Sequence, residues 1–214
     1  MAKISEHSLI HPEGKLGGFT FYKLRGKTIM RSLPTGPHKN KTNPSKLQQV
    51  YQRRLTEINA YLRPLSRVLD FGYQNYLDQK SGVNWAHTPL SVMGYNHEAT
   101  PRINPAFLQI SKGTLLGLEN VGISKSSAGI RITWTDNSKE GNASEGDNIM
   151  VLLNHPDFQK HVWIQEAARR RDLELVIPPI EGKEEFQWEV YLSVHRIFNR
   201  KKTLISDSVY LGRV

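Results

Sequence analysis

The sequence predicts an α+β protein in three parts: a basic β-hairpin, a helical region and an all-β sandwich. A hairpin is indicated because residues 19–32 alternate around a glycine-containing turn. Apolar side chains recur at helical spacing from residue 44 onward. The last half of the chain holds short alternating segments between turn signals, a pattern typical of two packed sheets. We therefore expect a hairpin arm and linker at 1–42, a helical segment and connector at 43–105, and the sandwich at 106–214.

The hairpin is the first element of the chain that the pattern predicts. Two alternating segments, 19–24 and 27–32, flank a tight turn. Since side chains alternate along a strand, Phe19 and Phe21 should lie on one face and Tyr22 on the other.

Gly26-Lys27-Thr28 resembles the end of a phosphate-binding P-loop. That motif requires a glycine five positions before Gly26, and Phe21 stands there. The residues after Thr28 also lack the start of a helix, which the motif needs to present its amides to phosphate. We therefore expect no nucleotide site in the hairpin.

A linker with three prolines separates the hairpin from the helical region. Asn43 is a plausible N-cap, and Pro44 suits the first helical position. The first helix should run to about residue 63, with its lysine and arginines largely off the apolar stripe. Pro64 should break it, and a second helix should continue to about residue 79. A short helix at 85–93 is also expected.

The sandwich is expected to contain eight short strands. They are 106–112, 121–124, 129–135, 148–154, 160–164, 172–176, 186–195 and 204–211. Because side chains alternate along a strand, Trp134 and Trp188 should point into the core of the sandwich. On the same basis Glu189, Tyr191 and His195 should point outward from the seventh strand. With a tryptophan on an early strand and a tyrosine on a late one, this region resembles a fibronectin type III or immunoglobulin-like module.

The net charge of +9 lies in the first third of the chain. Residues 1–70 hold 13 Lys/Arg and four Asp/Glu, whereas residues 71–214 hold 16 of each. Such asymmetry indicates a polyanionic partner, either nucleic acid or an acidic protein surface. The alternatives are that these charges are simply solvated, or that acidic patches of a neighbouring subunit neutralise them.

The predicted binding residues follow from this charge and from the hairpin aromatics. The candidate polyanion-binding residues are Lys15, Lys23, Arg25, Lys27, Arg31, Lys39, Lys41, Lys46, Arg53 and Arg54. The candidates for stacking on single-stranded bases are Phe19, Phe21 and Tyr22.

No pattern for catalysis or metal binding is found in the sequence. The chain has no cysteine, and its eight histidines do not form a zinc motif. The acidic loop at 135–148 lacks calcium-loop spacing and suits a turn better. Arg169-Arg170-Arg171, flanked by Glu166 and Asp172, is interpreted as an ordinary loop. We expect no metal, no cofactor and no enzymatic activity.

The chain also resembles a family of uncharacterised proteins common in the Bacteroidota. The shared motifs are "GKLGGFTFYKLRGKTIMRSLP", Asn43-Pro44 with "QQVYQRRL", "ISKGTLLGLENVGIS", "ITWTDNSKEGNASEGDNIMVLL" and the closing "SVYLG". The resemblance spans nearly the whole length and supplies no function, because that family is a domain of unknown function. A weaker similarity, in the Arg-Ser, Asn-Pro and Gln-Arg pattern, is to phage structural proteins.

Together these observations predict a non-enzymatic structural or assembly protein whose basic first third binds a polyanion. We expect a homo-oligomer or a part of a larger assembly. No signal peptide or membrane span is seen, so a cytoplasmic or virion-associated location is expected. The alternative is a surface or secreted module that binds carbohydrate or protein through the sandwich.

Overall fold

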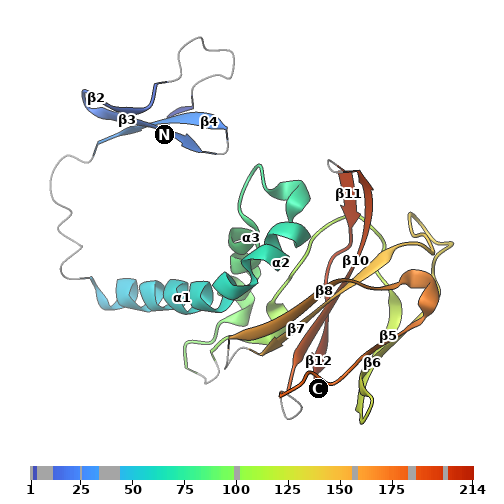
Figure 1. Ribbon diagram of the computed structural model, residues 1–214. Helices are drawn as coiled ribbons and strands as arrows, with labels where there is room; N and C mark the ends of the chain where they lie inside the picture. Colours follow the sequence, from blue (N-terminus) through green and yellow to red (C-terminus); the bar gives the residue numbers. More distant parts are fainter. Residues whose placement is uncertain are drawn as a thin grey trace. The chain divides into compact units, whose positions relative to one another are not determined.

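The chain is mixed α+β, with antiparallel sheets and short helices (Figure 1). The computed structural model describes residues 2–3, 12–24, 26–33, 44–98, 102–155, 159–182, 187–199 and 202–214. The chain divides into two compact units, Met1–Gln49 and Val50–Val214. In the part of the chain that the structure describes, no helix is long and apolar enough to cross a membrane.

The first unit holds one antiparallel sheet, drawn in blue in Figure 1. Its strands are β1 (Ala2–Lys3), β2 (Gly14–Leu16), β3 (Phe19–Leu24) and β4 (Lys27–Ser32), in the order β1-β4-β3-β2. The predicted hairpin is confirmed at both of its strands. Gly17 and Gly26 have φ values of +56° and +76°, which glycine adopts without steric cost in tight turns.

The helical region is more broken than the sequence predicts. Its elements are α1 (Lys46–Leu62), the 3₁₀ turn η2 (Arg63–Leu65), α2 (Ser66–Gly72), η3 (Gln74–Tyr76), α3 (Gly82–Pro89), the π turn η4 (Leu90–Gly94) and η5 (Pro105–Phe107). Pro64 lies in the 3₁₀ turn, where its missing N–H is tolerated. The expected second helix ends early, at Gly72, where the chain passes so close to Ile110 that a Cβ would lie 1.9 Å from its carbonyl oxygen.

Two further antiparallel sheets form the rest of the second unit. The strands are β5 (Glu119–Ser126), β6 (Gly129–Thr135), β7 (Asn148–His155), β8 (Lys160–Arg169), β9 (Glu174–Ile177), β10 (Glu189–Asn199), β11 (Lys202–Ile205) and β12 (Val209–Arg213). One sheet has the order β5-β6-β9, and the other β11-β10-β7-β8 with β12 also paired to β10. Trp134 and Trp188 are buried in the hydrophobic core that these two sheets share, as predicted.

Besides shifts in the bounds of others, two of the expected strands are absent or divided in the structure. The segment 106–112 is no strand, because the backbone N–H groups of Ile110 and Ser111 donate to the Ser208 hydroxyl rather than to a ladder. The last strand is split into β11 and β12 around Ser206, whose hydroxyl accepts the N–H of Val194 at 2.9 Å.

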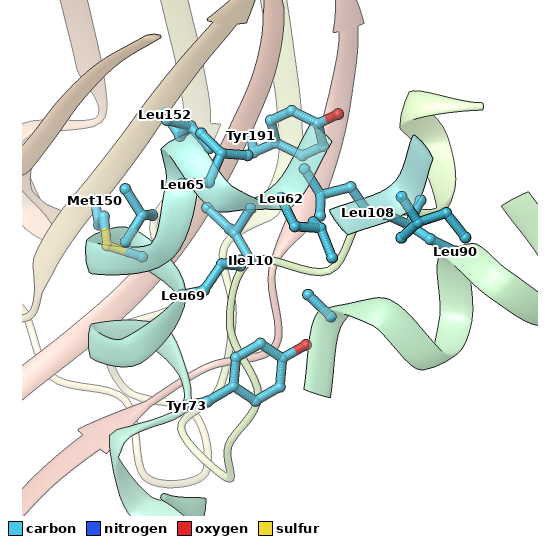
Figure 2. Close-up of a cluster of buried hydrophobic side chains, with 13 residues drawn as sticks. Leu62, Leu65, Leu69, Tyr73, Leu90, Leu108, Ile110, Met150, Leu152 and Tyr191 are labelled. Carbon is cyan, nitrogen blue, oxygen red and sulfur yellow. The ribbon is translucent and has the colours of Figure 1, made fainter. Parts of the chain in front are cut away.

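Helices cover the face of β10 that was expected to point outward. Glu189, Tyr191 and His195 are all buried, so that expectation is wrong. Figure 2 shows the cluster that buries Tyr191, in which side chains from the helices meet Met150 and Leu152 of the sheet. Both faces of β7 and β10 are therefore inside the protein, one against the second sheet and one against the helices.

Candidate polyanion-binding surface

The strand register of the first unit decides which of its charged residues share a face. Residues directly opposite each other in an antiparallel pair have side chains on the same face. Thr20 is opposite both Lys15 on β2 and Arg31 on β4. Two residues further along, Tyr22 is opposite Ile29, and Leu24 is opposite Lys27. One face therefore carries Lys15, Lys27 and Arg31 around Tyr22, and we call these four residues the cationic face.

The cationic face presents its charges at spacings set by the sheet. Lys15 and Arg31 lie two strands apart, or about 10 Å between backbones, and Lys27 and Arg31 are about 13 Å apart along β4. All three basic side chains are exposed. Lys15 and Arg31 form no ion pair with any described residue. The face can therefore offer several positive charges to one extended polyanion.

The opposite face of the same sheet carries the two phenylalanines of the hairpin. Phe19 and Phe21 lie there, as alternation predicted, opposite Ser32 and Met30. Lys23 is also on this face, and its ammonium is 2.9 Å from the Glu13 carboxylate. The structure thus separates the two predicted phenylalanines from the cationic face and leaves only Tyr22 beside the three charges. Arg25, Lys39 and Lys41 lie outside the described residues.

The basic residues of α1 are placed less favourably for binding an anion. Arg53 donates to the Glu57 carboxylate at 2.9 Å, one helical turn away. A hydrogen bond from Tyr95, with the charges of Arg53 and Arg102, lowers the pKa of Glu57, so this carboxylate stays charged. Lys46 is exposed near the start of the helix.

The sequence interpretation placed Arg54 away from the apolar stripe of the helix, but in the structure its side chain contacts other residues. Its guanidinium lies over the Tyr51 ring at 4.8 Å and donates to the Ser91 carbonyl at 3.3 Å. Arg54 therefore holds α1 to the segment after α3, and its charge is only partly available to a ligand.

A protein-family model matches nearly the whole length of the chain. The family model described as "Family of unknown function (DUF6266)" matches residues 12–212. The chain belongs to this family. Searches of curated proteins and of solved structures found no match.

In this DUF6266 chain, the sequence interpretation of Arg169-Arg170-Arg171 as an ordinary loop is wrong for its central residue. Arg170 is fully buried, and its guanidinium donates to Asp147 at 3.2 Å and to the carbonyls of Gly117 and Leu116 at 2.9 and 2.6 Å. Burial lowers the pKa of Arg170, and the Asp147 charge opposes that shift. The sequence signal for this pair was the position of Asp147, the last acid of the 135–148 loop, directly before β7.

The described residues of this DUF6266 chain contain no group of three or more His, Cys, Asp or Glu that could hold a metal ion. In the acidic loop at 135–148, Asp136 accepts the N–H of Ser138 at 2.9 Å, and Asp147 belongs to the buried ion pair. Both carboxylates therefore have structural partners within the fold.

Proposed function

We propose that this protein is a non-enzymatic structural or assembly protein whose basic N-terminal third binds nucleic acid or another polyanion. The observation that carries the proposal is the cationic face, where three adjacent strands bring Lys15, Lys27 and Arg31 around Tyr22. Lys/Arg contacts to phosphate supply most of the affinity in non-specific nucleic-acid binding. Tyr22 offers an aromatic ring between the charges, on which a base of a single strand can stack.

We also propose that the two sheets of the second unit form a fibronectin type III-like sandwich that provides subunit contacts. In the immunoglobulin arrangement, strands A, B and E share one sheet and strands G, F, C and C′ the other. The order β5-β6-β9 fits the first set, and β11/β12-β10-β7-β8 fits the second. The weaker similarity to phage structural proteins, in the Arg-Ser, Asn-Pro and Gln-Arg pattern, is the basis for proposing a role in an oligomer or larger assembly, cytoplasmic or virion-associated.

The test is the salt dependence of nucleic-acid binding by the full chain. The variant K15Q/K27Q/R31Q removes the cationic face, and K139Q/K160Q/R63Q removes equal charge from exposed positions elsewhere. Log affinity for single-stranded DNA should fall linearly with log salt, by about 0.7 per phosphate contacted. We expect the slope to fall by about two in the first variant and to stay unchanged in the second.

An equal slope in both variants and wild type would contradict the proposed site. Binding of an acidic protein with no binding of nucleic acid would identify the partner as a protein surface. Nucleic-acid affinity that does not depend on salt would contradict the electrostatic basis of the proposal.

A second candidate function is a carbohydrate- or protein-binding module on the sandwich. A cavity of about 230 Å³ supports it, lined by Ile130, Pro178, Pro179, Ile180 and Trp188 among others. An apolar lining with an aromatic wall suits the non-polar face of a sugar or a peptide side chain. Perturbation of residues around this cavity by soluble oligosaccharides, in the absence of nucleic-acid binding, would favour this alternative.

A further inference from the structure

The second unit contains an indole ring that faces two lysine ammonium groups. Trp85 lies on α3, and its ring stacks on the Tyr73 ring with centroids 6.1 Å apart and planes inclined by 6°. The Nζ atoms of Lys80 and Lys112 lie 5.1 Å and 5.5 Å from the indole centroid. The two nitrogen atoms are therefore no more than 10.6 Å apart.

Two tyrosines fix the position of the indole ring in this cluster. The indole N–H of Trp85 donates to the carbonyl of Tyr76 at 3.2 Å, and the Tyr76 ring meets the indole edge-on. Tyr73 is buried, and its hydroxyl donates to the Gln109 carbonyl at 3.0 Å. Tyr73 and Tyr76 thus fix the indole from two directions, and both ammonium groups lie over its ring.

No carboxylate among the described residues pairs with the positive charges of this cluster. Neither Lys80 nor Lys112 forms an ion pair within the described ranges of the chain. Two nearby carboxylates are engaged by backbone: Asp70 accepts the N–H of Gly82, and Asp207 accepts the N–H of Gly113, each at 3.0 Å. Two ammonium groups that share a single ring repel each other, and an anion between them would relieve that repulsion.

We propose that Lys80, Trp85 and Lys112 form a second phosphate-binding site for a nucleic-acid backbone. The proposal rests on the proposed function and extends it from the hairpin to the helical layer of the second unit. Both ammonium groups would donate to phosphate oxygens, as lysine does in phosphate sites generally. The exposed part of the indole would contact the sugar or base next to that phosphate.

The first test uses the full chain and two double variants. K80Q/K112Q removes the site, and K139Q/K160Q removes the same charge from two other exposed lysines. Single-stranded DNA is titrated at several salt concentrations. We expect the slope of log affinity against log salt to fall by about 0.7 to 1.4 in K80Q/K112Q, for one or two phosphates, and not to change in the control. Equal slopes in both double variants would overturn the site.

The second test separates this site from the proposed function as a whole. Inorganic tripolyphosphate is titrated into the ¹⁵N-labelled full chain, and the indole N–H signal of Trp85 is assigned by its absence in W85F. We expect the signal to shift in wild type and in K139Q/K160Q but not in K80Q/K112Q. If wild type shows this shift but does not bind nucleic acid, the proposed function fails while an anion site at Trp85 stands. A shift of the same size in K80Q/K112Q would overturn the site.

Discussion

Replacing Asp147 by asparagine should cause a large loss of stability. Asp147 is fully buried, and its two carboxylate oxygens contact two guanidinium groups, Arg170 at 3.2 Å and Arg196 at 2.6 Å. Oδ2 also accepts the backbone N–H of Ser144 at 2.9 Å. Asparagine keeps the size of the side chain but removes its charge and presents an N–H₂ group toward donors.

The magnitude follows from what remains when the carboxylate is lost. Arg170 is fully buried, so its charge would have no counter-ion and no access to water. Removing one partner of a buried ion pair costs about 3 to 5 kcal/mol. This is a large part of the 5 to 15 kcal/mol that is typical of a folded domain.

The assay is urea unfolding of D147N followed by circular dichroism, with the free energy taken from midpoint and slope. E174Q is the matched control, because Glu174 pairs with Arg131 at 2.8 Å on the surface and such pairs contribute at most about 1 kcal/mol. The double variant D147N/R170M should cost less than the sum of its single variants, because the buried cation is removed too. A loss below about 1 kcal/mol in D147N, or one equal to that of E174Q, would refute the reasoning.

Two further predictions concern the second unit. Burial lowers the pKa of His195, so near pH 6.5 the unfolded chain binds a proton that the folded protein does not. The free energy of unfolding should therefore fall below that pH, by up to about 1.4 kcal/mol per pH unit for this residue. Urea unfolding at pH 7.5, 6.5 and 5.5 should show a smaller fall in H195Q, and an equal fall would exclude His195 as a cause. The folding of residues 106–214 by themselves stays a prediction. We expect this fragment to melt cooperatively, but at a lower temperature than a fragment of residues 50–214, because Met150, Leu152 and Tyr191 lose the helices that cover them. A fragment without a cooperative melt would place the boundary elsewhere.

Local patterns in the sequence were sufficient for the elements whose side chains interact mainly with near neighbours. The hairpin 19–32 follows from alternation on either side of a glycine turn, and its register then fixes the faces of Phe19, Phe21 and Tyr22. Strand β6 was predicted with its observed bounds, because Ile130, Ile132 and Trp134 alternate with polar residues. The concentration of positive charge in the first third is likewise a property of the sequence alone.

Long-range contacts decided the features that the sequence left open or predicted wrongly. Alternation on β10 does not show that helices 100 residues earlier cover Tyr191 and His195. The burial of Arg170 depends on Asp147 and on carbonyls more than 50 residues away.

The same division holds for the candidate binding sites. Composition placed the positive charge in the first third, but strand pairing placed Lys15, Lys27 and Arg31 on one face and Lys23 on the other. The approach of Lys80 and Lys112 to Trp85 requires the fold, because 32 residues separate the two lysines. A linear sequence encodes the period of each element and the sum of its charges, whereas the faces that meet depend on packing between distant segments.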